Sequence, residues 1–163
     1  DSYEFDVDHE GHWGRDSGWI AQNADRFVAG DVPDVAVIHV GTEDMASRTD
    51  PPAAVSDRAV ENIGRLVAVL RSKNAGVRIV LSRVIPLRGK SVDVAMLNRK
   101  VSQLAGSLGT AQSPVVIADQ SDGFDPDSDL AKDGKLPNRM GARKMAKVFC
   151  HAIFAALASG PGQ

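Results

Sequence analysis

Acidic side chains that can do chemistry occur in two short segments. Glu43 and Asp44 follow Gly41 directly after an apolar run, and Asp133 begins the segment Asp-Gly-Lys-Leu-Pro-Asn. Two carboxyl groups held close together acquire different pKa values, so Glu43 and Asp133 are candidates for a general acid and base pair. This chemistry requires a fold that brings both segments to one place.

The four histidines offer fewer possibilities. His39 lies inside an apolar run, which favours a packed side chain over a base. His9 and His12 occur in Asp-His-Glu-Gly-His, but this loop lacks the helix that His-Glu-x-x-His zinc enzymes use. We therefore predict a loop that contacts substrate or is structural, with no metal ligands and no cofactor. His151 is expected on the last helix, far from the other three.

Three further groups have simpler interpretations. Asp125–Asp129 resembles the start of a calcium loop, but Leu130 stands where that loop needs glycine, so we predict a solvated acidic loop, with weak calcium binding as the alternative. Ser17 precedes Gly-Trp and is predicted to cap a helix rather than to act as a nucleophile. Cys150, the only cysteine, is predicted to be a buried thiol. The basic residues expected to form ion pairs with Glu43 and Asp133 are Arg83, Arg88, Lys90 and Lys135.

Composition excludes several classes of protein. The 163 residues are 43% hydrophobic and 25% charged, as in ordinary globular domains. The 19 Lys and Arg against 21 Asp and Glu give a net charge of −2, which argues against a nucleic-acid partner. No apolar run approaches the roughly 20 residues that span a bilayer, so no membrane partner is expected. The acidic start lacks the apolar segment of a signal peptide, which leaves both secreted and cytoplasmic locations open.

The elements that must position these residues alternate along the chain. Three β-branched apolar runs, at 35–40, 77–81 and 115–118, are typical of parallel strands covered on both faces. Helical spacing appears at 17–29, 55–70, 94–108 and 145–157, with Ser91 or Asp93 as the cap of the third helix, and Tyr3–Val7 is a possible edge strand. We predict an α/β fold, a three-layer α/β/α sandwich with a short parallel sheet, formed by one domain over residues 1–163. Functional groups of such sheets collect at the carboxyl ends of the strands.

Three segments resemble the SGNH (GDSL-type) hydrolases. Residues 34–45 resemble the Gly-x-Asn-Asp block of this family, and residues 133–138 resemble its closing Asp-x-x-His-Pro-Asn block. Residues 8–12 and 17–19 resemble the second block of its acetylxylan-esterase-like carbohydrate esterases. The resemblance runs from about residue 3 to about residue 157, and it implies a flavodoxin-like arrangement and hydrolysis of carbohydrate or acyl esters.

Several catalytic residues of the family are absent from the corresponding positions of this sequence. The Gly-Asp-Ser block has no counterpart in these 163 residues. Glu43 stands at the position of the Asn donor, where an ionised carboxylate only accepts hydrogen bonds, and Leu136 stands at the position of the His base. Asp133 remains, and Gly18 remains as a backbone donor to an oxyanion.

Two functions follow as hypotheses, with a small-molecule or carbohydrate ester as the ligand of both. The first is an esterase whose nucleophile lies outside this chain or whose site has been rebuilt. The second is an inactive relative that binds a ligand or performs other chemistry through Glu43 and Asp133. The residues predicted to contact substrate are Trp13, Trp19, Thr42, Asp44 and Leu136, with the two tryptophans as a stacking platform for sugars.

The strand at 35–40 is expected to have one unpaired edge. The family's first strand lies beside it, and this chain shows no counterpart of that strand. Because unpaired backbone groups must find partners, we expect another strand to fill the place. The candidates are Tyr3–Val7, a second copy of the chain in a homodimer, or a partner strand from a separate fragment of the same gene product. The alternative is an upstream part of the protein that is not in these 163 residues, which would also supply a nucleophile.

Overall fold

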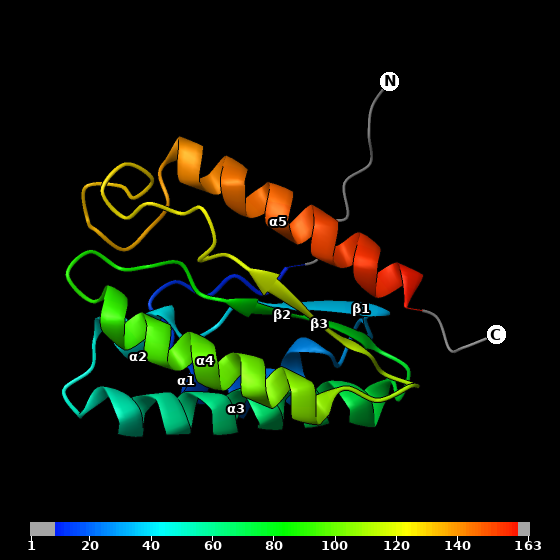
Figure 1. Ribbon diagram of the computed structural model, residues 1–163. Helices are drawn as coiled ribbons and strands as arrows, with labels where there is room; N and C mark the ends of the chain where they lie inside the picture. Colours follow the sequence, from blue (N-terminus) through cyan, green and yellow to red (C-terminus); the bar gives the residue numbers. More distant parts are fainter. Residues whose placement is uncertain (1–8, 160–163) are drawn as a thin grey trace.

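The computed structural model describes residues 9–159, so the predicted edge strand Tyr3–Val7 lies outside the described residues. Helices and strands alternate along most of this range (Figure 1). In chain order the elements are α1 (Ser17–Phe27), β1 (Val35–Ile38), α2 (Thr42–Ala46), α3 (Pro52–Lys73), β2 (Arg78–Arg83), α4 (Ser91–Leu108), β3 (Val115–Asp119) and α5 (Arg139–Ala158).

The three strands form one parallel sheet in the order β1-β2-β3. Val35 of β1 is paired with Arg78 of β2, and Ile79 of β2 is paired with Val115 of β3. The predicted strands are confirmed with small changes at their ends, since β1 ends at Ile38 and β2 continues to Arg83. All three carboxyl ends therefore lie at the same edge of the sheet.

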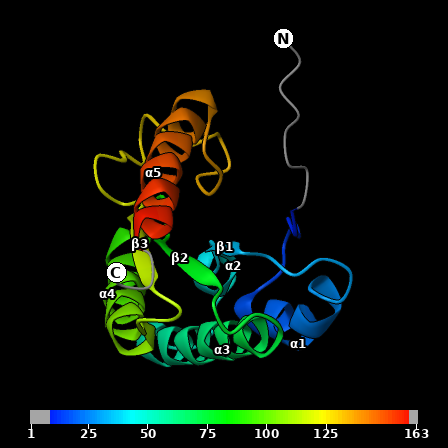
Figure 2. The ribbon, with the colours of Figure 1, turned by 90° about the vertical axis from the view of Figure 1, so that its right-hand side faces the viewer.

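Helices cover both faces of this sheet, which confirms the predicted three-layer α/β/α sandwich (Figures 1 and 2). The helices α3 and α4 pack below the sheet in these views, and α5 packs above it. Successive strand residues point to opposite faces, so Leu81 joins the core with α3 and α4, whereas Val80 joins the core with α5. The first core also contains Ile63 and Leu97, while the second is built mainly of small residues such as Ala152 and Ala156.

Two predicted helix caps and one predicted burial are wrong. The α1 cap is Asp16, whose carboxylate accepts the Trp19 N–H at 2.8 Å, because Ser17 is already helical and its hydroxyl is used elsewhere. The α4 cap is Lys90, because the chain turns one residue before Ser91. Cys150 is exposed, because the stripe of α5 that faces the sheet contains Ala152 and Ala156 instead.

A glycine is required in the turn between β1 and α2. Gly41 has a φ of 118°, and a Cβ atom there would lie 2.7 Å from Cδ2 of Leu97. Glycine adopts such a φ without steric cost, so the chain turns at Gly41 into α2. This turn places Thr42, Glu43 and Asp44 at the carboxyl edge of the sheet.

Within residues 9–159, no helix combines the length and the apolarity that a membrane-spanning helix needs.

Candidate functional site

Glu43 makes an ion pair with a lysine from the closing loop. Lys135 Nζ lies 2.5 Å from Glu43 Oε1, and the two side chains are 25% and 17% exposed. The same ammonium lies 5.4 Å from the centre of the Trp13 ring. We call Trp13, Glu43 and Lys135 the rim cluster. It joins three segments that are far apart in the sequence, and it confirms the predicted ion pairing for Lys135.

The Asp133 carboxylate accepts hydrogen bonds from the backbone of its own turn. Its Oδ1 accepts the N–H groups of Lys135 at 2.9 Å and of Leu136 at 3.0 Å. These backbone bonds, that of Leu136 first, lower the pKa of Asp133 below its ordinary value. Asp133 therefore remains ionised and orders the loop, whose bend passes through Gly134 at a φ of 68°. Lys135 contacts both predicted acid–base partners, with its backbone on Asp133 and its ammonium on Glu43.

Leu136 lies half-buried in the same loop. Its carbonyl oxygen accepts the Ala131 N–H at 2.7 Å, and an isolated antiparallel bridge joins Leu130 to Pro137. An aliphatic side chain does not accept or donate a proton, so this position contributes shape and apolar surface only.

Asp44 holds the start of α1. Its carboxylate accepts the Ser17 N–H at 2.9 Å and the Ser17 hydroxyl at 2.5 Å. Asn62 of α3 donates to the same hydroxyl at 3.1 Å. This network fixes Gly18, which is half-buried and whose N–H makes no hydrogen bond outside its own helix among the described residues. The Asp44 carboxylate thus uses its hydrogen bonds within the protein. The Gly18 N–H has no such partner outside its helix among the described residues, as its predicted role as a donor requires.

The two tryptophans lie in different surroundings. Trp13 is 73% exposed and contacts Lys135, whereas Trp19 is half-buried beside His12, Phe27 and Arg15. Each ring thus has its own set of contacts, and only Trp13 belongs to the rim cluster. Thr42 is half-buried at the start of α2, next to Glu43.

His39 follows β1 and packs as predicted. Its Nδ1 lies 2.9 Å from the Ser82 hydroxyl, and its ring meets Phe149 of α5 edge to face. Burial lowers the pKa of His39 from 6.5 to about 4, so the ring is neutral near pH 7. Ser82 itself is only 1% exposed.

The other predicted loops make local contacts. His12 Nε2 lies 2.7 Å from Glu10, and His9 accepts the Gly11 N–H. Across residues 9–159 there is no cluster of three side chains suited to a metal ion. In the acidic loop, Asp129 is buried and pairs with Lys144 at 2.6 Å. This bond, followed by a backbone bond from Asp125, lowers the pKa of Asp129.

The predicted ion pairs of the other basic residues are partly wrong. Lys90 donates instead to the carbonyl oxygens of Met45 and Ala46, where it caps the end of α2. Arg83 pairs with Asp119, and Arg88 lies near Asp127. Sequence reasoning missed these partners and also Asn62 and Ser82, because each contact joins residues of separate elements and leaves no local pattern.

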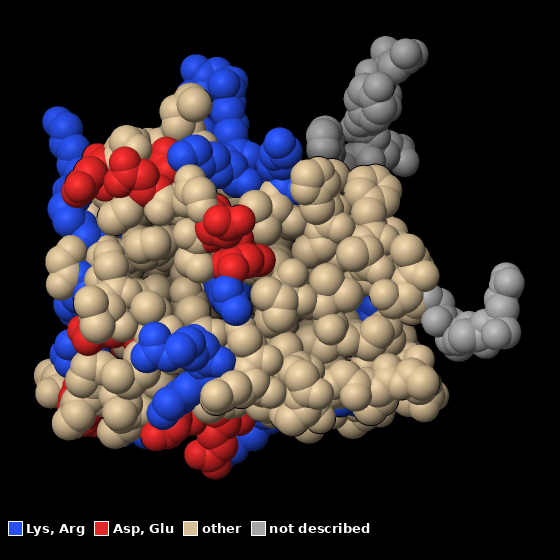
Figure 3. All heavy atoms as spheres, viewed as in Figure 1, with Lys and Arg blue, Asp and Glu red and all other residues tan. Residues whose placement is uncertain are grey.

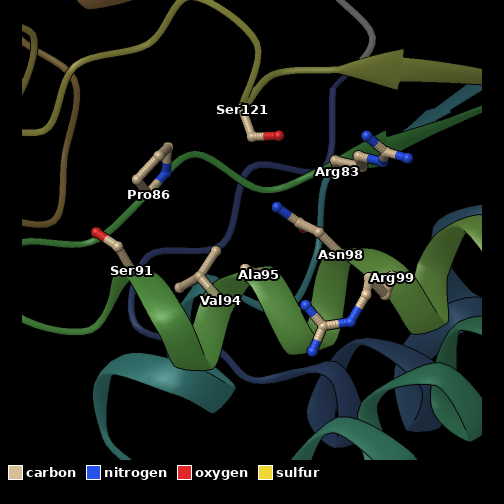
Figure 4. Close-up of a pocket in the computed structure, with 8 residues that line it drawn as sticks. All are labelled: Arg83, Pro86, Ser91, Val94, Ala95, Asn98, Arg99 and Ser121. Carbon is tan, nitrogen blue, oxygen red and sulfur yellow. The ribbon is translucent and has the colours of Figure 1, made fainter.

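A pocket of about 240 Å³ lies between α4 and the segments that follow β2 and β3 (Figure 4). Figure 4 shows Asn98 and Ser121 on opposite sides of it. Asn98 uses its amide oxygen and nitrogen on the backbone of Val84, both at 2.9 Å. None of the predicted catalytic or substrate-contacting residues lines the pocket. The Asn98 amide, which does line it, already uses its hydrogen bonds within the protein.

Charge is unevenly spread over the molecule. On the face shown in Figure 3, Lys, Arg, Asp and Glu gather on the side of the loops at the carboxyl ends of the strands, while the other side is largely uncharged. Both signs are interspersed there, as expected for ion pairs between loops. The polar rim of the sheet is therefore the candidate site.

Comparison with known proteins gives matches among solved structures. No protein-family model matches the sequence, and no curated protein matches it. An acetyl esterase variant solved with an acetate ion is 29% identical with a TM-score of 0.83, and the match covers 93% of this chain and 72% of that one. A family 3 carbohydrate esterase from Talaromyces cellulolyticus gives the same four values. A family 3 carbohydrate esterase from Clostridium thermocellum, 19% identical with a TM-score of 0.71, shares the fold over 92% of this chain and 71% of its own.

Proposed function

We propose, from the premise that this chain is an SGNH/GDSL-type hydrolase relative with an esterase-like fold, that it binds a carbohydrate ester at the rim of its sheet without hydrolysing it. The observation that carries the proposal is the ion pair between Glu43 and Lys135. It stands where the resemblance requires an Asn side chain to donate to an oxyanion. An ionised carboxylate accepts hydrogen bonds only and repels such an oxyanion.

Two other features of the closing loop support the absence of ester hydrolysis. Leu136 replaces the imidazole base, and Asp133, which would orient that base, accepts two backbone N–H groups instead. A hydroxyl nucleophile needs a base within hydrogen-bond reach. Among residues 9–159, the rim therefore lacks the base that a hydroxyl nucleophile needs for ester hydrolysis.

The rim retains features suited to ligand binding. The Trp13 ring is largely exposed and presents an apolar face, and Lys135 beside it supplies a donor. Binding sites typically combine aromatic surface with a few fixed polar groups. The similarity to the acetyl esterase and to the carbohydrate esterase from Talaromyces cellulolyticus supports the choice of ligand class that we propose, an acetylated sugar.

Tryptophan fluorescence tests the binding. The chain has only two tryptophans, so titration with acetylated xylo-oligosaccharides is expected to change the emission of Trp13 saturably. Trp13→Ala is expected to abolish the change, whereas Trp19→Phe, the matched control, is expected to retain it. A titration without saturation in the wild-type protein contradicts the proposal.

Turnover of p-nitrophenyl acetate and of acetylated sugars tests the absence of hydrolysis. We expect no turnover above the buffer rate for the wild-type protein. A variant with Glu43→Asn and Leu136→His measures whether restoring both groups restores activity. If the wild-type protein hydrolyses these esters and Glu43→Gln abolishes the activity, Glu43 takes part in the reaction. This result contradicts the proposal.

Ester hydrolysis is the second candidate, favoured by one contact. The bond between His39 and Ser82 is the only Ser–His hydrogen bond among the described side chains. The burial of Ser82 argues against its reaction with a substrate. Wild-type turnover that is lost in Ser82→Ala, a variant that leaves the rim cluster intact, favours this candidate.

A further inference from the structure

One wall of the pocket beside α4 is a single face of that helix. The residues of α4 that line the pocket are spaced three and four apart, as one helical face requires, and they are Ser91, Val94, Ala95, Asn98 and Arg99. Ala95 lies in the middle of this face and has the smallest side chain of the five. Its methyl group leaves room in front of the helix.

The opposite wall comes from the chain that follows β2 and β3. Figure 4 shows Pro86 and Ser121 across the pocket from α4, with Arg83 to one side. All the lining residues lie between positions 83 and 121, at the end of the sheet formed by β2 and β3. None of them is Asp or Glu, whereas two are arginines.

The two arginines differ in their partners. Arg83 forms an ion pair with Asp119, and its Nε–H donates to the Ser102 hydroxyl at 2.8 Å. Arg99 is exposed, and within residues 9–159 its guanidinium has no ion pair and no hydrogen bond. Figure 4 shows this guanidinium turned back along α4 toward Ala95, the direction that long side chains take on a helix. Arg99 therefore brings an unneutralised positive charge to the pocket.

This charge and the size of the pocket favour a small carboxylate as the ligand. The planar guanidinium of Arg99 matches a carboxylate through two parallel hydrogen bonds. A phosphate monoester carries nearly two negative charges near pH 7, and Arg99 alone would leave part of that charge unmatched. The volume of about 240 Å³ lies below the roughly 300–1,000 Å³ typical of pockets for drug-sized ligands. Pro86, Val94 and Ala95 offer apolar surface to a short carbon skeleton.

The two serines of the pocket favour a hydroxyl group on the same ligand. The Ser121 hydroxyl donates to Asp119 at 2.6 Å, and the Ser91 hydroxyl donates to the Leu87 carbonyl oxygen at 3.2 Å. Because these bonds use the serine protons, both oxygens can only accept a further hydrogen bond. A ligand hydroxyl can donate to them, whereas a carbonyl or ether oxygen cannot.

We propose that this pocket binds a small hydroxycarboxylate. Its carboxylate pairs with Arg99, its hydroxyl donates to Ser91 or Ser121, and its carbon skeleton lies against Pro86 and Val94. Free hydroxy acids and sugar acids share this chemistry. No residue of the rim cluster lines the pocket, so the proposal does not depend on the ligand of the rim cluster.

NMR titration of the protein tests the proposal. The probes are lactate and glucuronate, with lactamide as the analogue that lacks the charge and propionate as the one that lacks the hydroxyl. We expect lactate or glucuronate to shift the Arg99 Nε–H and the Ala95 N–H resonances saturably. Lactamide should bind about tenfold or more weakly than lactate because it cannot pair with Arg99, and propionate should also bind more weakly.

Substitutions in the pocket separate its groups. Arg99→Gln should weaken lactate binding about tenfold or more, whereas Arg143→Gln, which removes an exposed arginine of α5 outside the pocket, should leave it unchanged. Ala95→Leu places a good helix former at an exposed position, fills the pocket and should abolish binding. The double variant Ser91→Ala and Ser121→Ala should bind lactate and propionate alike.

Several results would overturn the proposal. They are the absence of saturable shifts with both acids, equal binding of lactate and lactamide or of lactate and propionate, and wild-type affinity in Arg99→Gln. Loss of lactate binding in Trp13→Ala would assign the acid to the rim cluster instead. Binding of glucuronate without lactate supports a sugar acid as the ligand, and binding of lactate without glucuronate supports a smaller hydroxy acid.

Discussion

The two faces of the sheet are covered to different extents. The face toward α3 and α4 buries large side chains such as Ile63, Leu81 and Leu97, all nearly inaccessible. The face toward α5 buries a smaller set, centred on Val80 and alanines. Large buried side chains contribute most to folding stability, so the first face should hold the fold together while the second tolerates change.

Truncation in the two cores measures this difference. Leu81→Ala should lower the free energy of unfolding by about 3 kcal/mol, because it leaves a cavity in the larger core. Phe149→Ala, at a half-buried ring on the other face, should cost about 1.5 kcal/mol. Urea denaturation of both variants gives the two values, and equal losses would show that the faces contribute alike.

Acid should weaken the fold through His39, which belongs to the α5 face. Its pKa in the folded protein, about 4, lies below the ordinary value of 6.5, so the unfolded chain binds the proton more tightly. The contribution of the neutral ring is complete above pH 6.5 and is lost as the pH falls toward 4. The loss should be about 2–3 kcal/mol across this window.

The variant His39→Gln separates this effect from other titrations. Glutamine can still bond to Ser82, but it does not titrate, so the unfolding free energy of this variant should change less between pH 6.5 and 4. The carboxyl groups of Asp129 and Asp133, whose pKa values are lowered, still titrate in it at lower pH. An unchanged slope in His39→Gln would remove the histidine from the acid response.

Removal of the Asp44 carboxylate tests the contact that ties α1 to the larger core. Asp44→Ala leaves the buried Ser17 hydroxyl and N–H without their acceptor, and should cost about 2 kcal/mol. Asp44→Asn retains an acceptor and should cost about half as much. Thermal unfolding of the pair measures the difference, and a loss below about 0.5 kcal/mol for Asp44→Ala would show that α1 is held by α3 alone.

Sequence patterns predicted the helices and strands well because the pattern that identifies each element lies within that element. The β-branched run 115–118 and the helical stripe from Val55 to Leu70 identify their elements without any knowledge of the partners. The contacts of the site are different. Glu43 and Lys135 are 92 residues apart, and nothing near either residue indicates the other. Cys150 and Lys90 were misplaced for the same reason, since the packing of α5 and the end of α2 decide their surroundings.

Neutralising Lys135 should have the smallest effect on stability, although the rim cluster is the site of the proposed function. Lys135→Met removes a partly exposed ion pair, and such pairs contribute about 0–1 kcal/mol. The loss should therefore be well below that of Asp44→Ala, whose acceptor serves buried groups. Urea denaturation at low and at 1 M salt checks this, because salt should reduce the wild-type stability toward that of the variant. A loss above about 2 kcal/mol would mean that the rim cluster supports the fold, and its side chains would then have a structural reason to be there that needs no ligand.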